Sequence, residues 1–121
     1  MKNTGERFQI WNDKRILEIN SPKTQISGPH TVVFKNLEER WAIVALDWKP
    51  EPKGDAEPRL GIRWFWRSGG NPFSSGNGTW FIIPPSLSRI ILSALPIDHF
   101  LGGRIDDFLC GKITGAELKK R

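Results

Sequence analysis

Residues 41–48 read WAIVALDW and residues 59–67 read RLGIRWFWR, and these two stretches decide the fold class. Both are rich in β-branched and aromatic residues, and each has the length of one strand. Side chains on both faces of 41–48 are largely apolar, which predicts a central strand. The second stretch is split by alternation, because successive side chains in a strand point to opposite faces. One face would carry Leu60, Ile62, Trp64 and Trp66, and the other Arg59, Gly61, Arg63, Phe65 and Arg67.

Short apolar runs on either side of these stretches extend the predicted sheet. Asn12-Asp13 is a turn-prone pair between two such runs, so we expect a hairpin at the start of the chain. The stretch Lys49–Pro58 carries three prolines and is expected to be an exposed connection. The additional predicted strands are Phe8–Trp11, Arg15–Ile19, Thr31–Lys35 and Trp80–Ile83.

The C-terminal third of the chain has helical periodicity. Apolar residues at i, i+3, i+4 and i+7 predict one buried helix face, with Ser86 as the cap; they are Leu87, Ile90, Ile91 and Ala94. A second helix is predicted from Asp98, and Thr114-x-x-Glu117 is a capping-box pattern. Strands therefore come first and helices after them. This order predicts an α+β fold, with a curved antiparallel sheet of about four or more strands followed by two or three C-terminal helices.

Length and composition limit the classes of protein. A chain of 121 residues predicts a single domain over 1–121, with a sheet-plus-helix core over about 31–95 and a helical extension over 97–121. The net charge is +5, and there are six Trp and no Tyr, which favours an anionic partner. No apolar run approaches the roughly 18 residues of a membrane span, so no membrane partner is expected. The polar N-terminus lacks a secretory signal, which predicts a cytoplasmic protein.

The basic face of 59–67 suggests the function. Three arginines interleaved with one aromatic ring suit a single strand of DNA or RNA, because guanidinium groups hold phosphates and a flat ring stacks on a base. The alternative is an ordinary amphipathic strand with a solvated basic face. Trp41 is a second candidate ring or a packed core tryptophan, and Lys35 and Arg40 would extend the basic surface. The predicted binding residues are Arg59, Arg63, Phe65, Arg67, Trp41, Lys35 and Arg40.

Two further segments bear on binding. The Gly-, Ser- and Asn-rich stretch Ser68–Gly78 lacks the Gly-Lys-Ser/Thr ending of a phosphate-binding loop. It is either a hairpin arm that closes on nucleic acid or a long flexible turn. The basic tail, Lys112 and Lys119–Arg121, is either a non-specific phosphate attractor or simply solvated.

Catalytic patterns are weak. Cys110 with His99 is a conceivable thiol dyad, but Cys110 lies in an apolar helical stretch and is expected to be a small core residue. Asp106-Asp107 would point in different directions on a helix, and no metal-ligand spacing is present. We therefore expect a protein that is not an enzyme, with no cofactor and no metal.

Four segments, taken in order, resemble the single-stranded-DNA-binding domain of the positive-cofactor transcriptional coactivator family. They are Trp41-Ala-Ile-Val, Ile62-Arg63-Trp64, Gly78-Thr79-Trp80-Phe81-Ile82 and Leu87–Leu95. The resemblance covers about residues 31–95 and implies a curved four-stranded sheet, a helix and a dimer, with Arg63 contacting the nucleic-acid backbone. Asn77 replaces the lysine usual in the family. Residues 97–121 follow the helix and are candidates to cover its dimerising surface.

A different class of function remains open. A Trp-rich face would also suit a small-ligand or protein-interaction module, such as an accessory protein of a mobile genetic element. Salt separates the two hypotheses, because nucleic-acid binding weakens by orders of magnitude between about 50 and 200 mM salt. An aromatic pocket would hardly respond.

Overall fold

The computed structural model describes residues 12–65, 70–74 and 76–120. Within them, four antiparallel strands form an open sheet in the order β1-β2-β3-β6, and β4 and β5 form a separate two-stranded sheet. The predicted α+β class is confirmed. The elements are α2 (Asp13–Leu17), β1 (Ile26–Asn36), β2 (Trp41–Trp48), β3 (Glu57–Trp64), β4 (Phe73–Ser74), β5 (Asn77–Gly78), β6 (Phe81–Ile83), α3 (Pro85–Ala94), α4 (His99–Leu109) and α5 (Gly115–Lys119).

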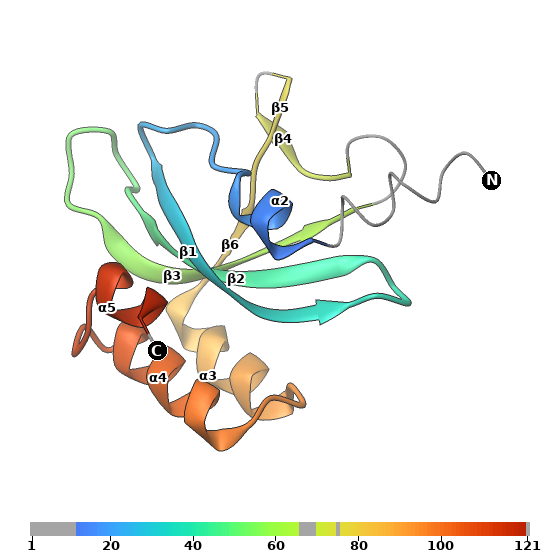
Figure 1. Ribbon diagram of the computed structural model, residues 1–121. Helices are drawn as coiled ribbons and strands as arrows, with labels where there is room; N and C mark the ends of the chain where they lie inside the picture. Colours follow the sequence, from blue (N-terminus) through green and yellow to red (C-terminus); the bar gives the residue numbers. More distant parts are fainter. Residues whose placement is uncertain (1–11, 66–69, 75, 121) are drawn as a thin grey trace.

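The sheet is curved, with α3, α4 and α5 against one face and α2 against the other (Figure 1). We call these the helix face and the α2 face. Strands β2 and β3 pair without a register shift from Trp41↔Trp64 to Trp48↔Glu57. Strand β1 pairs irregularly with β2 beside Gly28, whose φ of 98° favours glycine. Such irregularities bend a strand and increase its twist, which accounts for part of the curvature.

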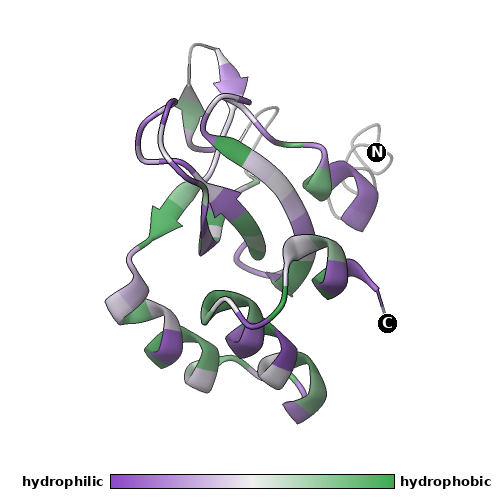
Figure 2. Ribbon diagram, turned by 90° about the vertical axis from the view of Figure 1, so that its left-hand side faces the viewer, coloured by the Kyte–Doolittle hydropathy of each residue, from purple (hydrophilic) through white to green (hydrophobic). Residues whose placement is uncertain are grey.

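Each face of the sheet has its own hydrophobic core. Strand β2 contributes to both, because its residues from Ala42 to Leu46 are all buried, which confirms the predicted central strand. The strand layer lies above the helix layer in Figure 2. The helix-face core contains Val33, Ile43, Ala45, Leu60, Ile83, Ile105, Phe108 and Leu118. The α2-face core contains Ile16, Ile26, Ala42, Val44, Leu46, Phe65 and Trp80.

The predicted strand Arg15–Ile19 is wrong, because this segment overlaps helix α2. The side chain of Asn12 accepts a hydrogen bond from the backbone N–H of Lys14 at 2.8 Å and caps the helix. Asn and Asp favour helix starts as well as hairpin turns, so the Asn12-Asp13 pair was ambiguous. Packing against the sheet stabilises this short helix, because Ile16 is fully buried in the α2-face core. The predicted strand Phe8–Trp11 lies outside the described residues.

Helix α3 is present, but its predicted buried face is largely exposed. Leu87 is 47 % exposed and Ile90 63 % exposed, and Ala94 is also exposed, whereas Ser88 is buried. The predicted cap is also wrong, because the N-cap position is Pro84 and no side chain caps the helix. The residues of α3 and its end that pack on the helix-face core are Ile91, Leu92 and Leu95. We call Leu87, Ile90 and Ala94 the α3 stripe.

The last two helices pack against the sheet and leave the α3 stripe open. Asp98 Oδ1 accepts the Leu101 N–H at 2.7 Å and starts α4, as predicted. The predicted capping box between Thr114 and Glu117 is confirmed at the start of α5. Ile105 and Phe108 of α4 and Leu118 of α5 are buried in the helix-face core.

Cys110 is exposed, contrary to the prediction of a core residue. It lies at the C-cap of α4, where Arg89 Nη2 approaches its Sγ at 3.7 Å. His99 begins the same helix, so the two residues are separated by about 16 Å along the helix axis. They therefore do not form a thiol dyad.

Candidate nucleic-acid interface

The alternation predicted along β3 is present as far as Phe65. Leu60 and Ile62 belong to the helix-face core, and Phe65 belongs to the α2-face core. The α2 face was expected to be open, but it is covered at Gly61, Arg63 and Phe65, which are all buried. Segments that precede β1 and follow β5 supply this cover: Ile16 of α2 and Trp80 both pack there.

Arg63 is 1 % exposed, so it is not the surface phosphate contact that the sequence predicted. Its Nη1 donates to the carbonyl oxygens of Thr79 at 2.9 Å and Pro72 at 3.3 Å. Its guanidinium also lies over the ring of Phe65, 5.2 Å from the centroid. Burial lowers the pKa of Arg63 to about 10, so the group is still charged at neutral pH. Arg63 is therefore an internal cation that joins Pro72 and Thr79 to β3.

Phe65 is also internal, at 7 % exposure, and does not offer a stacking surface. Its ring meets the Trp80 ring edge-on, with centroids 6.4 Å apart. The Trp80 Nε1–H donates to the carbonyl oxygen of Ile19 at 2.6 Å, which ties the segment after α2 over this part of the sheet. The predicted use of Phe65 as a base platform is therefore contradicted by its packing.

Trp41 lies on the opposite face of the sheet from Arg63 and Phe65. It packs against the helix-face core, 5.6 Å from the ring of Phe34, and its Nε1–H donates to Glu39 Oε1 at 2.7 Å. One strand of nucleic acid on one face of the sheet cannot contact all three residues. The predicted grouping of Trp41 with the β3 arginines is wrong for this reason.

The remaining predicted cations lie at two ends of the α2 face. Lys35 Nζ forms an ion pair with Asp13 Oδ1 at 2.7 Å, and Arg40 lies in the β1–β2 turn. Arg59 is at the other end of β3, where it pairs with Glu57 and lies over the Trp48 ring at 5.9 Å. Arg67 lies outside the described residues.

Sequence reasoning missed the exposed ring closest to this face. Phe73 is 51 % exposed on the hairpin formed by β4 and β5, which we call the arm. The Asn77-Gly78 pair suggested a turn in this region, but these two residues form strand β5, opposite Ser74 and Phe73. A Cβ at Gly78 would lie 2.5 Å from Arg63 Nη1, so glycine is needed where the arm meets the buried guanidinium.

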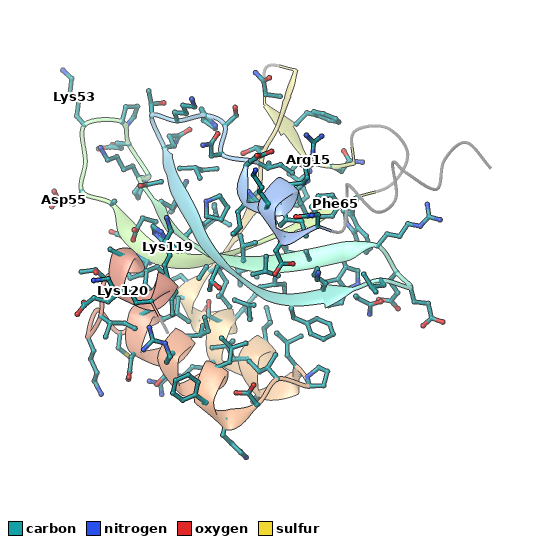
Figure 3. All side chains as sticks on the ribbon, in the orientation of Figure 1. Arg15, Lys53, Asp55, Phe65, Lys119 and Lys120 are labelled. Atoms are coloured by element: carbon teal, nitrogen blue, oxygen red, sulfur yellow. The ribbon has the colours of Figure 1, made fainter. Side chains whose placement is uncertain are left out.

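The base of the arm is joined to the sheet beside the β1–β2 turn. Trp64 bridges to Asn71, with N···O distances of 2.8 and 3.0 Å in the two directions, and Trp64 pairs with Trp41 in register. The Phe65 N–H donates to the carbonyl oxygen of Arg40 at 2.8 Å. Arg15 of α2 lies on the same side of the sheet as Phe65 (Figure 3). Cations and the half-exposed Phe73 ring therefore surround this end of the α2 face.

The charge of the described surface is mixed rather than strongly basic. The predicted tail lysines, Lys112, Lys119 and Lys120, are exposed, but they belong to the helical side of the molecule. Arg15 has Glu18 as a partner at 3.9 Å. Much of the surplus positive charge falls outside the described residues, which exclude Lys2, Arg7, Arg67 and Arg121.

Comparison of the chain with protein-family models, curated proteins and solved structures gives no match. The described part of the chain has no cluster of three or more His, Cys, Asp or Glu side chains arranged to hold a metal ion. Among the helices described, none combines the length and the apolar character that crossing a membrane requires.

Proposed function

We propose that this chain binds single-stranded nucleic acid where the arm and the β1–β2 turn meet on the α2 face. The observation that carries the proposal is the half-exposed Phe73 ring on an arm held from beneath by a buried guanidinium. Arg63 supports the site in this proposal and does not touch the ligand. The cytoplasmic location expected from the sequence is part of the same proposal.

The arm supplies the stacking surface. Arg63 Cζ is 5.9 Å from the centroid of the Phe73 ring, and the same guanidinium binds the carbonyl groups on both sides of the arm. A ring held in this way loses little conformational entropy when a base stacks on it. Stacking on an aromatic ring contributes roughly 1–3 kcal/mol per base and tolerates any sequence.

Cations around the arm supply the phosphate contacts. Arg40 lies in the turn beside the base of the arm, and Arg15 projects from α2 above the same face. Neutralising a phosphate releases condensed counterions, so each such contact adds about 0.7 to the salt slope for a single strand. A small number of contacts therefore predicts moderate affinity with a clear dependence on salt.

Fluorescence anisotropy of a labelled oligo-dT and of its duplex, between about 50 and 200 mM salt, tests the proposal. We expect tighter binding to the single strand, and Arg40→Gln should reduce the salt slope by about 0.7. Lys53→Gln is the matched control, because Lys53 is exposed in the β2–β3 connection. Preference for the duplex, or equal slopes for the two variants, would contradict the proposed site.

The α3 stripe favours a second candidate function, association with a second copy of this chain. Leu87 and Ile90 are exposed on α3, and Phe81 on the preceding edge strand β6 is 56 % exposed. None of these three side chains is charged, and the neighbouring Arg89 of α3 is paired with Asp106, so two copies of a basic chain could approach each other there with little repulsion. A homodimer would thus rest on a surface that sequence periodicity had assigned to the core.

The area of this surface predicts weak association. The exposed parts of Phe81, Leu87 and Ile90 amount to roughly 200 Å² in each copy. Removing roughly 400 Å² from water contributes about 10 kcal/mol, against an association cost of about 4–15 kcal/mol. We therefore expect a dimer with a Kd in the high micromolar to millimolar range.

Sedimentation equilibrium from about 10 µM to 1 mM tests the dimer. Ile90→Ser should shift the chain toward monomer, whereas Leu37→Ser should not, although Leu37 is similarly exposed at 59 %. Leu37 lies in the β1–β2 turn, far along the sheet from α3. A monomer throughout this range, or equal effects of the two substitutions, would exclude this interface.

A further inference from the structure

A groove of about 450 Å³ crosses the β1 edge of the sheet, between α2 on one side and α4 and α5 on the other. Among the described strands β1 pairs with β2 alone, so its outer edge is open to this groove at Thr31 and Val32. The volume lies within the range of about 300–1,000 Å³ that small-molecule sites occupy. Neither the proposed nucleic-acid contacts nor the α3 stripe uses the groove.

The groove has apolar walls. Leu17 of α2, Leu101 of α4 and Leu118 of α5 line it from three different helices. Phe100 also lines it and is 70 % exposed, the highest exposure among the large hydrophobic side chains described. The Arg104 guanidinium lies 5.9 Å from the centroid of the Phe100 ring. A ligand with an apolar body would cover this ring and remove apolar surface from water.

The charged side chains of the groove leave a positive excess. Asp13 is paired with Lys35, whereas Asp98 caps α4 and keeps its charge, so Arg104 and Lys119 leave an excess of one positive charge. Arg104 Nη2 donates to the carbonyl oxygens of Glu117 and Lys120, which do not neutralise its charge. Lys119 is exposed and has no ion pair within the described residues. The groove therefore favours an anionic group near Arg104 and Lys119.

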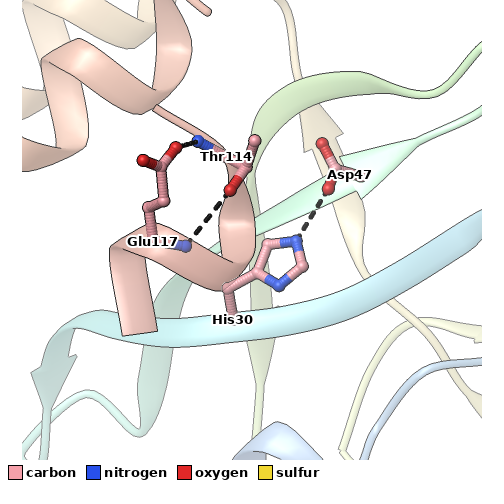
Figure 4. Close-up of polar contacts among 4 residues, drawn as sticks. All are labelled: His30, Asp47, Thr114 and Glu117. Atoms are coloured by element: carbon pink, nitrogen blue, oxygen red, sulfur yellow. Dashed lines mark hydrogen bonds and ion pairs between the residues drawn. The ribbon is translucent and has the colours of Figure 1, made fainter. Parts of the chain in front are cut away.

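His30 also lines the groove, and its ring is held by an interaction with Asp47. Its Nε2 lies 2.8 Å from Asp47 Oδ2, and its side chain is only 10 % exposed (Figure 4). The other ring nitrogen, Nδ1, is buried with no hydrogen-bond partner among the described residues. This nitrogen lies near Gly28 and is closed to solvent, so a ligand in the groove does not contact it in this conformation.

We propose that this groove binds a small organic anion with an apolar body, such as a medium-chain carboxylate. The carboxylate lies beside Lys119 and Arg104, and the hydrocarbon lies along Leu101, Leu118 and Phe100. Calorimetric titration of the full chain with octanoate, with octan-1-ol as the uncharged analogue, tests the site. The expected result is saturable binding of octanoate at one site below about 5 mM, with octan-1-ol at least about tenfold weaker.

Two matched pairs of variants locate the site. Lys119→Gln should weaken octanoate binding by at least about fivefold, whereas Lys120→Gln, one residue outside the lining, should leave it within about twofold. Phe100→Ala should weaken binding, whereas Phe81→Ala should not. All four side chains are exposed, so loss of folding does not confuse the comparison.

Three results would overturn the proposal: no saturable binding by about 5 mM, equal binding of octan-1-ol, or equal effects within a matched pair. Oligo-dT binding is measured separately on the same variants. Lys119→Gln and Phe100→Ala should leave it unchanged, so failure of the groove and failure of the nucleic-acid site are distinguishable.

Discussion

Replacing the buried guanidinium of Arg63 by alanine should destabilise the protein by about 3–5 kcal/mol. Hydrogen bonds from a charged donor contribute about 1.5–3 kcal/mol each; Arg63 donates to the carbonyl groups of Thr79 and Pro72 and, at a longer 3.4 Å, to that of Trp64. These are net values, so they already include the desolvation that lowers its pKa. The loss is a large part of the total stability of about 5–15 kcal/mol typical of a small domain.

Urea unfolding followed by tryptophan fluorescence measures this loss. Arg63→Lys keeps the charge but not the forked donor, so we expect an intermediate loss of about 2 kcal/mol. Arg59→Ala, which removes a partly exposed ion pair with Glu57, should cost about 1 kcal/mol or less. If Arg63→Ala unfolds within about 1 kcal/mol of the unmodified chain yet loses oligo-dT binding, Arg63 is a ligand contact and our reasoning is wrong.

Three other substitutions test the packing of the fold. Burial lowers the pKa of Arg63 to about 10, so above about pH 10 the folded state binds fewer protons than the unfolded state. Stability relative to Arg63→Leu should therefore rise from about pH 9 to pH 11, and an unchanged difference would contradict the lowered pKa. Ile16→Ala should cost about 2–5 kcal/mol in urea unfolding, since Ile16 of α2 is fully buried in the α2-face core; a loss under about 1 kcal/mol would mean that α2 is not packed there. Gly103→Ala should raise stability by up to about 1 kcal/mol, because an added Cβ meets no atom within 4 Å in α4; destabilisation would argue against that helix.

The strand pattern could be predicted because alternation and apolar content are local properties. Residues 41–48 are apolar on both faces, and β2 is buried on both faces. The split of β3 into two sets of side chains is likewise correct at Leu60, Ile62 and Phe65. Capping chemistry is local too, so the starts of α4 and α5 at Asp98 and Thr114 were predictable.

The cover over the α2 face could not be predicted, because it depends on contacts between distant parts of the chain. The Trp80 indole N–H donates a hydrogen bond to the carbonyl oxygen of Ile19, which lies 61 residues earlier in the chain. That contact helps to cover the α2 face, where the alternation of β3 had predicted Arg63 to be exposed to solvent. The same limit applies to α3. Its apolar side chains extend around more of the helix than the sheet can cover, and periodicity alone does not identify the side chains that face the core. Ile91 is packed inward, whereas Ile90 is exposed.

The most direct test of the proposed nucleic-acid site compares two phenylalanines of similar exposure. Phe73 on the arm is 51 % exposed and Phe81 on β6 is 56 % exposed, so alanine at either position removes a similar surface ring. Titration of labelled oligo-dT should show that Phe73→Ala weakens binding about 5- to 150-fold, which corresponds to the loss of one stacked base. Phe81→Ala should leave the affinity unchanged. Equal affinities for the two variants would contradict the assignment of the arm as the stacking surface.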